Sequence, residues 1–223
     1  MFKKNMWEKL LLFNNKSEPR LWDDYQQIKS NIEFTSFRKG YQSFSIISPQ
    51  SGEGKTMASC HLAMIFASEG HKVLLIDGNL AKPMLHHLFE VDNGQGLSNV
   101  LVGQLKLSDA ILKTRFSGLN VLPSGPDSKY SKTMFQTSAM ESLLDEAKTS
   151  HDYIFIDNSS ALVGNTGKLI SSKSDGTVLV IKDKRTDIDE MIEAKIALEA
   201  YEVNILGVIF IGKKLPMMKR VFS

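Results

Sequence analysis

Residues 44–57 read FSIISPQSGEGKTM, and this stretch decides the fold. An apolar run is followed by a glycine-rich turn, which leads into Lys55 and Thr56 at the start of an expected helix. This order is typical of a phosphate-binding loop, because glycines let backbone N–H groups turn inward and a helix N-terminus attracts anions. The stretch therefore predicts a nucleotide site. Pro49 stands where the general pattern has its first glycine, so the match is incomplete.

The residues of this loop have expected tasks. Lys55 is expected to reach the β- and γ-phosphates, and the Thr56 hydroxyl is expected to ligate Mg²⁺. The alternative is a glycine-rich strand–helix turn that holds no ligand. The candidate nucleotide-binding residues are Ser51, Gly52, Glu53, Gly54, Lys55, Thr56 and Met57.

Two further apolar runs end in an aspartate, VLLID at Asp77 and YIFID at Asp157. In open α/β sheets ligands bind at the carboxyl ends of the strands, so both carboxylates are expected beside the loop. Magnesium prefers oxygen ligands. The candidate metal ligands are therefore Thr56, Asp77 and Asp157, and the alternative is that both aspartates are solvated strand ends or helix caps.

The rest of the chain alternates short apolar runs with amphipathic segments. Nearly continuous apolar runs are typical of strands buried on both faces. The alternation predicts an α/β fold of the P-loop NTPase kind, a mostly parallel sheet with helices on both faces. Strands are expected at 43–47, 72–77, 119–123, 152–157, 176–181 and 204–211, and helices at 22–34, 56–69, 139–148 and 187–201.

Length and composition limit the number of domains, the kinds of partner and the covalent cross-links that are possible. The 223 residues suit one domain, and 42% hydrophobic residues are enough for a sizeable core. With 27 basic and 25 acidic residues, the net charge of +2 gives no argument for nucleic acid, and the single Cys60 excludes an intrachain disulfide. We expect a cytoplasmic protein with an N-terminal arm at 1–20, a P-loop domain at 21–215 and a short basic and apolar tail at 216–223.

Several motifs together resemble those of the bacterial tyrosine kinases of capsule and exopolysaccharide synthesis, a P-loop family related to the partition and septum-site ATPases. The resemblance runs from about residue 22 to 213 and rests on SPQSGEGKT, VLLIDGNLAKP, NGQGLSNVLVGQ, VLPSGP and YIFID. Partition ATPases usually carry a lysine where this chain has Gln50, which favours the kinase branch.

The resemblance implies ATP and Mg²⁺ as cofactors, phosphorylation of tyrosines in a C-terminal tail, and activation by a membrane polysaccharide co-polymerase. Lys55 and Asp77 are then the catalytic residues, and Asp157 contributes to the metal shell. The partner would bring a cytoplasmic protein to the membrane, and the family also implies a homo-oligomer.

The chain departs from the family pattern at working positions. The usual Asp-x-Asp-x-Arg motif reads DGNLA at 77–81, so Asn79 replaces a carboxylate and Ala81 replaces a cation. An amide does not accept a proton near neutral pH, so Asn79 cannot act as a general base. Ile211 stands where the family has an adenine-facing Asn, which leaves base selectivity open, and no tyrosine follows Tyr201.

Two more departures concern a turn and the contacts between subunits. After the second aspartate, Asn158 and two serines replace Thr-Pro-Pro, which exchanges a rigid turn for a flexible polar one. On the first helix the family usually joins subunits through a Glu and two Arg. The matching residues here are Asp23, Gln26 and Lys29.

Three functions follow from these patterns. The first is a kinase that is weakened at Asn79 and Ala81. The second is a non-catalytic pseudokinase that regulates a partner. The third is a partition-type ATPase switch that dimerises on ATP, and Gln50 counts against it. Nucleic-acid binding is not indicated, because no basic stripe accompanies exposed aromatic residues.

Overall fold

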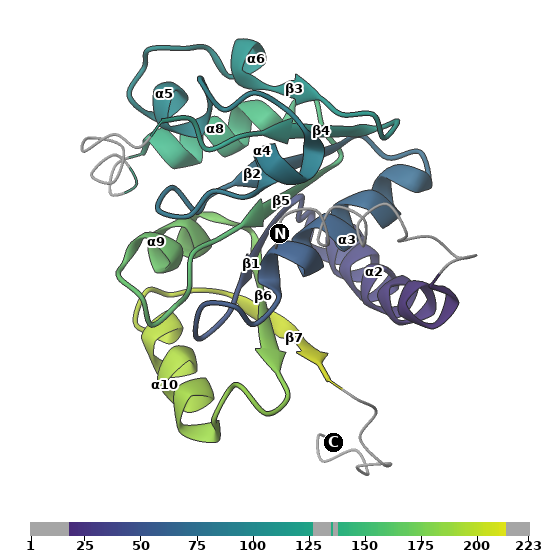
Figure 1. Ribbon diagram of the computed structural model, residues 1–223, viewed down its shortest axis with the longest axis vertical. Coiled ribbons are helices and arrows are strands. Elements are labelled where there is room, and N and C mark those ends of the chain that lie inside the picture. The colour runs from purple at the N-terminus through teal and green to yellow at the C-terminus, as the bar shows by residue number, and fades with distance from the viewer. Residues whose placement is uncertain (1–17, 127–134, 136–137, 213–223) are drawn as a thin grey trace.

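A seven-stranded sheet, in the order β3-β4-β2-β5-β1-β6-β7, forms the centre of the molecule (Figure 1). The computed structural model describes residues 18–126, 135 and 138–212. Within them, neighbouring strands run parallel except for β3 and β4. The strands are β1 (Ser43–Ile47), β2 (Val73–Asp77), β3 (Leu112–Lys113), β4 (Leu119–Leu122), β5 (Tyr153–Asp157), β6 (Gly176–Lys182) and β7 (Ile205–Ile211).

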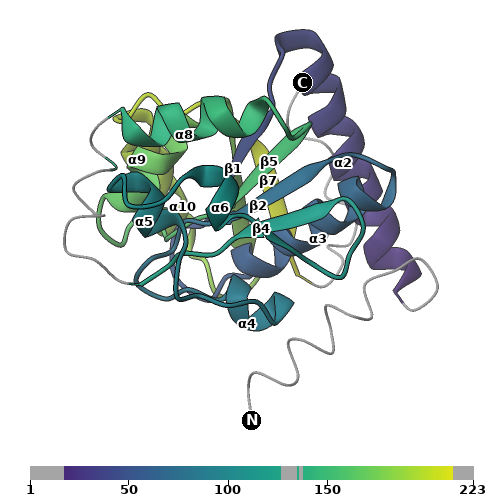
Figure 2. The same ribbon diagram turned by 90° about the horizontal axis from the view of Figure 1, so that it is seen from above.

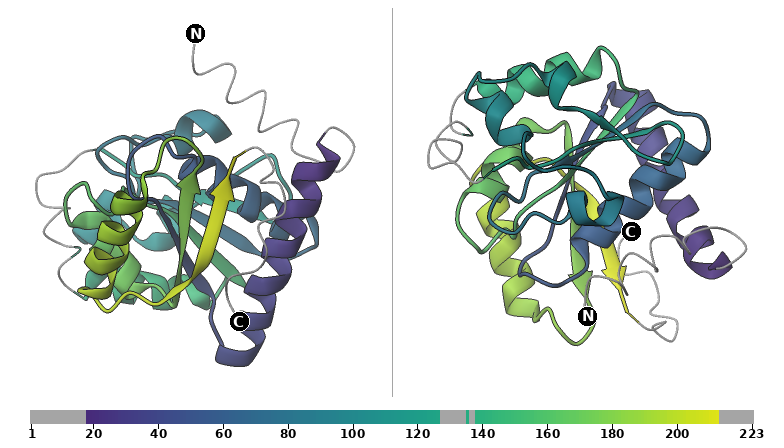
Figure 3. Two further views of the ribbon diagram at one scale, coloured as in Figure 1. Left: turned by 90° about the horizontal axis from the view of Figure 1, so that it is seen from below. Right: turned by 45° about the horizontal axis from the view of Figure 1, so that its top comes forward.

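Helices cover both faces of this sheet (Figure 2). They are α2 (Pro19–Lys39), α3 (Lys55–Ser68), α4 (Leu85–Phe89), α5 (Leu97–Leu101), α6 (Leu107–Ala110), α8 (Ala139–Lys148), α9 (Thr166–Lys173) and α10 (Ile188–Glu199). The core cluster on one face includes α2, α3 and α4, and the clusters on the other include α5, α6, α8, α9 and α10. The left view of Figure 3 shows α2 and α10 on opposite sides of β6 and β7.

Strand β2 shows why the apolar runs are continuous. Successive side chains of a strand point to opposite faces of the sheet. Leu75 joins the cluster around α3, whereas Leu74 and Ile76 join the cluster around α5 and α8. Because both faces are covered, every position of the strand is buried. The predicted mostly parallel sheet with helices on both faces is therefore confirmed.

Most expected elements are present, and the short ones were missed. The ends of each expected strand lie within one residue of the prediction. The helix expected at 22–34 is longer, running over Pro19–Lys39, and Gly40 caps it with φ of 71°. Sequence patterns missed the two-residue β3 and the short helices α4, α5, α6 and α9. Such pieces are too short to show a hydrophobic period.

The ends of the chain lie largely outside the described residues. The arm expected at 1–20 is described only from residue 18, and the tail expected at 216–223 is not described. In the described part of the chain, the helices are all too short or too polar to cross a lipid bilayer.

Helix α2 is fastened to α3 by two of the residues that match subunit-joining positions of the family. The Lys29 amine, 5% exposed, contacts Glu33 at 2.8 Å and Glu69 at 2.7 Å, and Gln26 donates to Glu69 at 3.0 Å. Burial lowers the pKa of Lys29, but the hydrogen bonds to the two carboxylates outweigh it and raise the pKa. Only Asp23 of the three positions is left exposed. Lys29 and Gln26 thus serve packing within one chain.

Candidate functional site

The glycine-rich loop joins the carboxyl end of β1 to the first turn of α3. Gly52 and Gly54 have φ of 83° and 99°, a region that side chains rarely occupy. A Cβ on Gly54 would lie 2.7 Å from Ile211 Cδ1. Glycine is therefore required at position 54 both for its backbone angle and for the close approach of β7.

The loop presents a run of backbone N–H groups that have no partner among the residues that the structure describes. Within the described residues, hydrogen bonds occupy the N–H of Gln50, bound to Glu53 Oε2 at 2.7 Å, and that of Ala58, bound to Gly54 O at 3.0 Å. Between Gln50 and Ala58, the N–H groups of residues 51–57 donate no hydrogen bond to any described residue. Nearly all backbone donors in folded proteins find a partner. Unpaired donors at a helix N-terminus form an anion site.

Asp77 and Asp157 stand side by side at the carboxyl ends of β2 and β5, where they are register partners. Both are essentially inaccessible, at 0% and 1% exposure. Two buried carboxylates in neighbouring positions repel each other when both are charged. The pair is therefore suited to a cation that neutralises both.

Burial raises the pKa of Asp77 to about 6, although N–H groups of the neighbouring backbone oppose the rise. Asp77 Oδ2 accepts from the N–H of Leu85 at 3.0 Å and of Met84 at 2.9 Å, and Oδ1 accepts from Asn79 N–H at 3.3 Å. The strand-end aspartate thus also accepts from N–H groups at the start of α4.

Burial and the charge of Asp77 raise the pKa of Asp157 to about 7, against the charge of Lys55 and hydrogen bonds from Thr56 and Ser59. The Ser59 hydroxyl lies 3.5 Å from Asp157 Oδ1 and donates to Lys55 O at 2.9 Å. Lys55 itself is 6% exposed. The structure therefore brings the predicted residues Lys55, Thr56 and Asp157 into one charge-coupled group.

The oxygen atoms gathered here match a hard divalent cation. A hydroxyl and two carboxylates are the donors that Mg²⁺ prefers, whereas softer metals prefer nitrogen and sulfur. Among the described residues, His, Cys, Asp and Glu form no cluster of three or more that could hold a metal. A cation at this pair therefore needs additional oxygen ligands, such as those of a phosphate.

The side chain of Glu53 faces away from the loop interior, although Glu53 is one of the predicted nucleotide-binding residues. It is 0% exposed, and its carboxylate accepts from Gln50 N–H and from the Thr186 hydroxyl. Only the backbone N–H of Glu53 remains to face a phosphate. Thr186 is 133 residues away along the chain, so no local sequence signal could have found this contact.

Asn158 is fixed rather than flexible. It is 0% exposed, and its Nδ2 donates to Ser45 Oγ at 3.0 Å and to Gly167 O at 2.9 Å. The expectation of a flexible turn after Asp157 was wrong, because the buried amide links β1 to α9.

Two hollows flank the loop. One, of about 290 Å³, lies beside Ser51 and is lined by Asn79, Ala81 and Lys82 on the connection after β2 and by Ser160 after β5. The other, of about 540 Å³, lies beside Gly54 and Met57 and is lined by the ends of β6 and β7 and by α2. The loop therefore separates a smaller hollow at the connection after β2 from a larger hollow next to β7, which is lined by more large apolar side chains, among them Met57 and Ile211.

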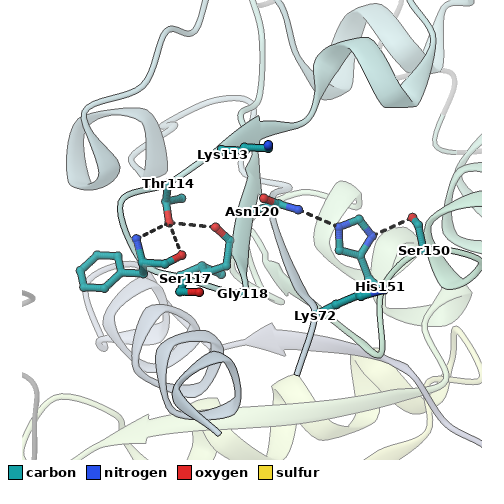
Figure 4. Close-up of a pocket in the computed structure, with 10 residues that line it drawn as sticks. Lys72, Lys113, Thr114, Ser117, Gly118, Asn120, Ser150 and His151 are labelled. Carbon is teal, nitrogen blue, oxygen red and sulfur yellow. Dashed lines mark hydrogen bonds between the residues drawn. The ribbon is translucent and has the colours of Figure 1, made fainter. Parts of the chain in front are cut away.

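A third hollow, of about 300 Å³, opens at the amino ends of β2, β4 and β5, away from the loop (Figure 4). His151 Nε2 lies 3.2 Å from Asn120 Nδ2, and its Nδ1 lies 3.0 Å from Ser150 Oγ. Burial lowers the pKa of His151. Because both ring nitrogens are engaged, this histidine ties β4 to the turn before β5.

Comparison with known proteins agrees with this geometry. The family described as AAA domain matches residues 42–186. The tyrosine-protein kinase YwqD of Bacillus subtilis (strain 168) is 35% identical over 193 residues, covering 86% of this chain and 81% of the relative. The chimerical protein CapA2B2 has a TM-score of 0.83 at 28% identity, covering 91% of this chain and 89% of that one. The septum site-determining protein MinD of Pyrococcus horikoshii OT3, complexed with Mg-ADP, has a TM-score of 0.66 at 26% identity, covering 76% and 69%. The chain therefore belongs to the family of bacterial tyrosine kinases of capsule and exopolysaccharide biosynthesis, a P-loop family related to the septum-site ATPases.

Proposed function

We propose that the chain binds Mg-ATP at residues 51–57 and is a tyrosine-kinase-like protein whose phosphotransfer is weakened. One observation supports this most: a continuous run of N–H groups at a helix N-terminus, unpaired within the described part of the chain, stands next to a pair of buried carboxylates. Such a run attracts a polyphosphate, and the carboxylates attract its metal.

The hollows give the nucleotide a direction. The larger one beside Gly54 and Met57 is lined by Tyr25 and suits a base and ribose. The smaller one beside Ser51 is lined by Lys82 and Ser160 and suits the end of the phosphate chain. The inner phosphates then lie at the first turn of α3, and the terminal phosphate lies near Ser51 and Gly52. A tyrosine hydroxyl can approach it from the smaller hollow beside Ser51.

The cofactor residues are those expected from the sequence. Thr56, Asp77 and Asp157 would hold Mg²⁺, which would supply positive charge against the charge that develops in phosphoryl transfer. Lys55, buried at the start of α3, places its amine against the phosphates. Its positive charge and that of the metal favour the charged form of Asp157.

The side of the site where phosphate would be transferred has few groups that can accept a proton or supply positive charge. Asp77 is the catalytic carboxylate that we propose, but three N–H groups already hold it. Asn79 cannot accept a proton, and Ala81 offers no charge. Lys82 lines the same hollow and can replace part of the missing positive charge.

Calorimetry with Mg-ATP tests the binding step. We expect heat of binding with the wild-type protein and none with Lys55→Met, because the amine that pairs with the phosphates is gone. Absence of heat with every magnesium nucleotide in the wild-type protein would exclude the proposal.

Phosphotransfer is measured separately, with radiolabelled ATP and a tyrosine-rich peptide. The reaction is run with and without the cytoplasmic part of a membrane polysaccharide co-polymerase, the partner that the family resemblance implies. We expect slow transfer that Asn79→Asp raises at least about tenfold, the usual size of a general-base contribution being about 10²–10⁴.

A non-catalytic regulator is the second candidate, and Asn79 and Ala81 favour it. It predicts that Asn79→Asp gives no transfer and that a co-polymerase still binds Lys55→Met. A partition-type switch is less supported. Gln50 stands where partition ATPases usually carry a lysine, and its Nε2 donates to Glu190 of α10 in the same chain at 3.2 Å. Dimerisation on ATP, seen by light scattering, would favour the switch.

A further inference from the structure

The outer side of the phosphate loop is fastened to the connection between β6 and α10. Arg185 Nη2 donates to Ser51 O at 2.9 Å, and the Thr186 hydroxyl donates to Glu53. Arg185 is exposed, whereas Glu53 is fully buried. Two successive residues of this connection therefore hold two residues of the loop.

The contact of Arg185 fixes the direction of a neighbouring N–H group. Ser51 C=O and Gly52 N–H belong to one planar trans peptide, so they point in opposite directions. Arg185 holds the carbonyl toward the β6–α10 connection. The Gly52 N–H must then point the other way, and this N–H belongs to the unpaired run.

Hydrogen bonds also fix the two peptides on either side of Gln50. Glu53 Oε2 accepts from Gln50 N–H at 2.7 Å, and the Ser48 hydroxyl donates to Gln50 O at 2.7 Å. Because Gln50 O is held, the N–H of Ser51 points away from Ser48. Thr186, through Glu53, thus supports the orientation that Arg185 sets one peptide later.

Arg185 also packs directly against the loop. A Cβ on Gly52 would lie 2.8 Å from Arg185 Nη2 and 3.1 Å from its Cζ. Glycine at position 52 leaves room for the guanidinium. The cation therefore lies at the end of the loop where the proposed function places the terminal phosphate.

We infer that Arg185 is a positioning residue for the terminal phosphate: by holding the Ser51–Gly52 peptide, it makes the site prefer a nucleoside triphosphate to a diphosphate. The inference rests on the proposed function, because it concerns the same nucleotide. Inner phosphates bind at the α3 end of the loop, so their affinity depends much less on this peptide.

Isothermal calorimetry of Mg-ATP and Mg-ADP tests this on the full chain. We compare wild type with Arg185→Ala, Arg185→Lys and Lys184→Ala. Lys184 is the matched control, since it is exposed, adjacent, and carries the same charge. We expect Arg185→Ala to lower the ratio of ATP to ADP affinity about fivefold, the usual effect of one hydrogen bond, and Lys184→Ala to leave it unchanged. Arg185→Lys should restore part of the ratio, because lysine keeps a donor.

Each outcome decides one question. An unchanged ratio in Arg185→Ala, or an equal loss for both nucleotides, overturns the inference while the proposed function stands. A wild-type protein that binds neither nucleotide overturns the proposed function instead. If thermal unfolding shows that Arg185→Ala does not fold, Arg185→Met replaces it. This variant keeps the aliphatic stem but removes the donor to Ser51 O, and an unchanged ratio in it also overturns the inference.

Discussion

Replacing Asp157 by Asn should stabilise the metal-free protein at high pH. The carboxylate is buried, and the pKa rises from its usual 3.8 to about 7. One pKa unit corresponds to about 1.4 kcal/mol, so keeping this group charged in the folded state costs about 4 kcal/mol. Asparagine keeps an oxygen that Ser59 and Thr56 can donate to, but it carries no charge. We expect Asp157→Asn to be about 2–4 kcal/mol more stable than wild type at pH 8.

The direction in which stability changes with pH follows from how many protons the folded and unfolded chains bind. Between the unfolded pKa near 4 and the folded pKa near 7, the folded wild-type protein holds more protons than the unfolded chain. The stabilising contribution of this group is therefore complete below pH 4 and is lost as pH rises through 7. Asp77, with its pKa raised to about 6, adds to the loss over the same range. The difference between variant and wild type should grow from small at pH 4.5 to its full size at pH 8.

Urea unfolding in EDTA at several pH values measures this difference. Asp145→Asn is the control, because Asp145 is an exposed carboxylate on α8. In a separate series without EDTA, added Mg-ATP should stabilise wild type and leave Asp157→Asn nearly unaffected, since the metal loses a ligand. If the difference in free energy of unfolding between Asp157→Asn and wild type stays constant from pH 4.5 to pH 8, the reasoning is refuted. Such a result would mean that burial does not raise the pKa of Asp157.

Two further predictions concern the loop and α2. Gly54→Ala should lower Mg-ATP affinity more than about tenfold, because a left-handed residue with a Cβ costs about 1–2 kcal/mol and this Cβ also collides with Ile211. The control is Gly103→Ala, which has φ of 72° and open space around it and should bind Mg-ATP normally in the same titration. Lys29→Met should lower the free energy of unfolding in urea by about 2 kcal/mol, less than a fully buried pair because its partners are partly exposed. Lys195→Met, which removes an exposed pair with Glu199, should change it by less than about 0.5 kcal/mol, and equal losses in the two lysine variants would contradict the role given to Lys29.

The sequence by itself determined the fold class, the position of the phosphate loop and the strand-end aspartates. These features are local: an apolar run buried on both faces, glycines at left-handed positions, and a lysine and hydroxyl at a helix start each show within a few residues. The N–H groups of residues 51–57, which have no partner in the described ranges, belong to the residues that the loop pattern selected.

Only the tertiary structure decided what surrounds these residues. The register that pairs Asp77 with Asp157, and the burial that raises both pKa values, depend on the strand order β2-β5-β1. The buried side chain of Glu53 is engaged by Gln50 and Thr186, and Arg185 reaches Ser51 from 134 residues away. Such contacts join distant segments whose pairing depends on the free energy of the whole fold, so no local pattern carries them.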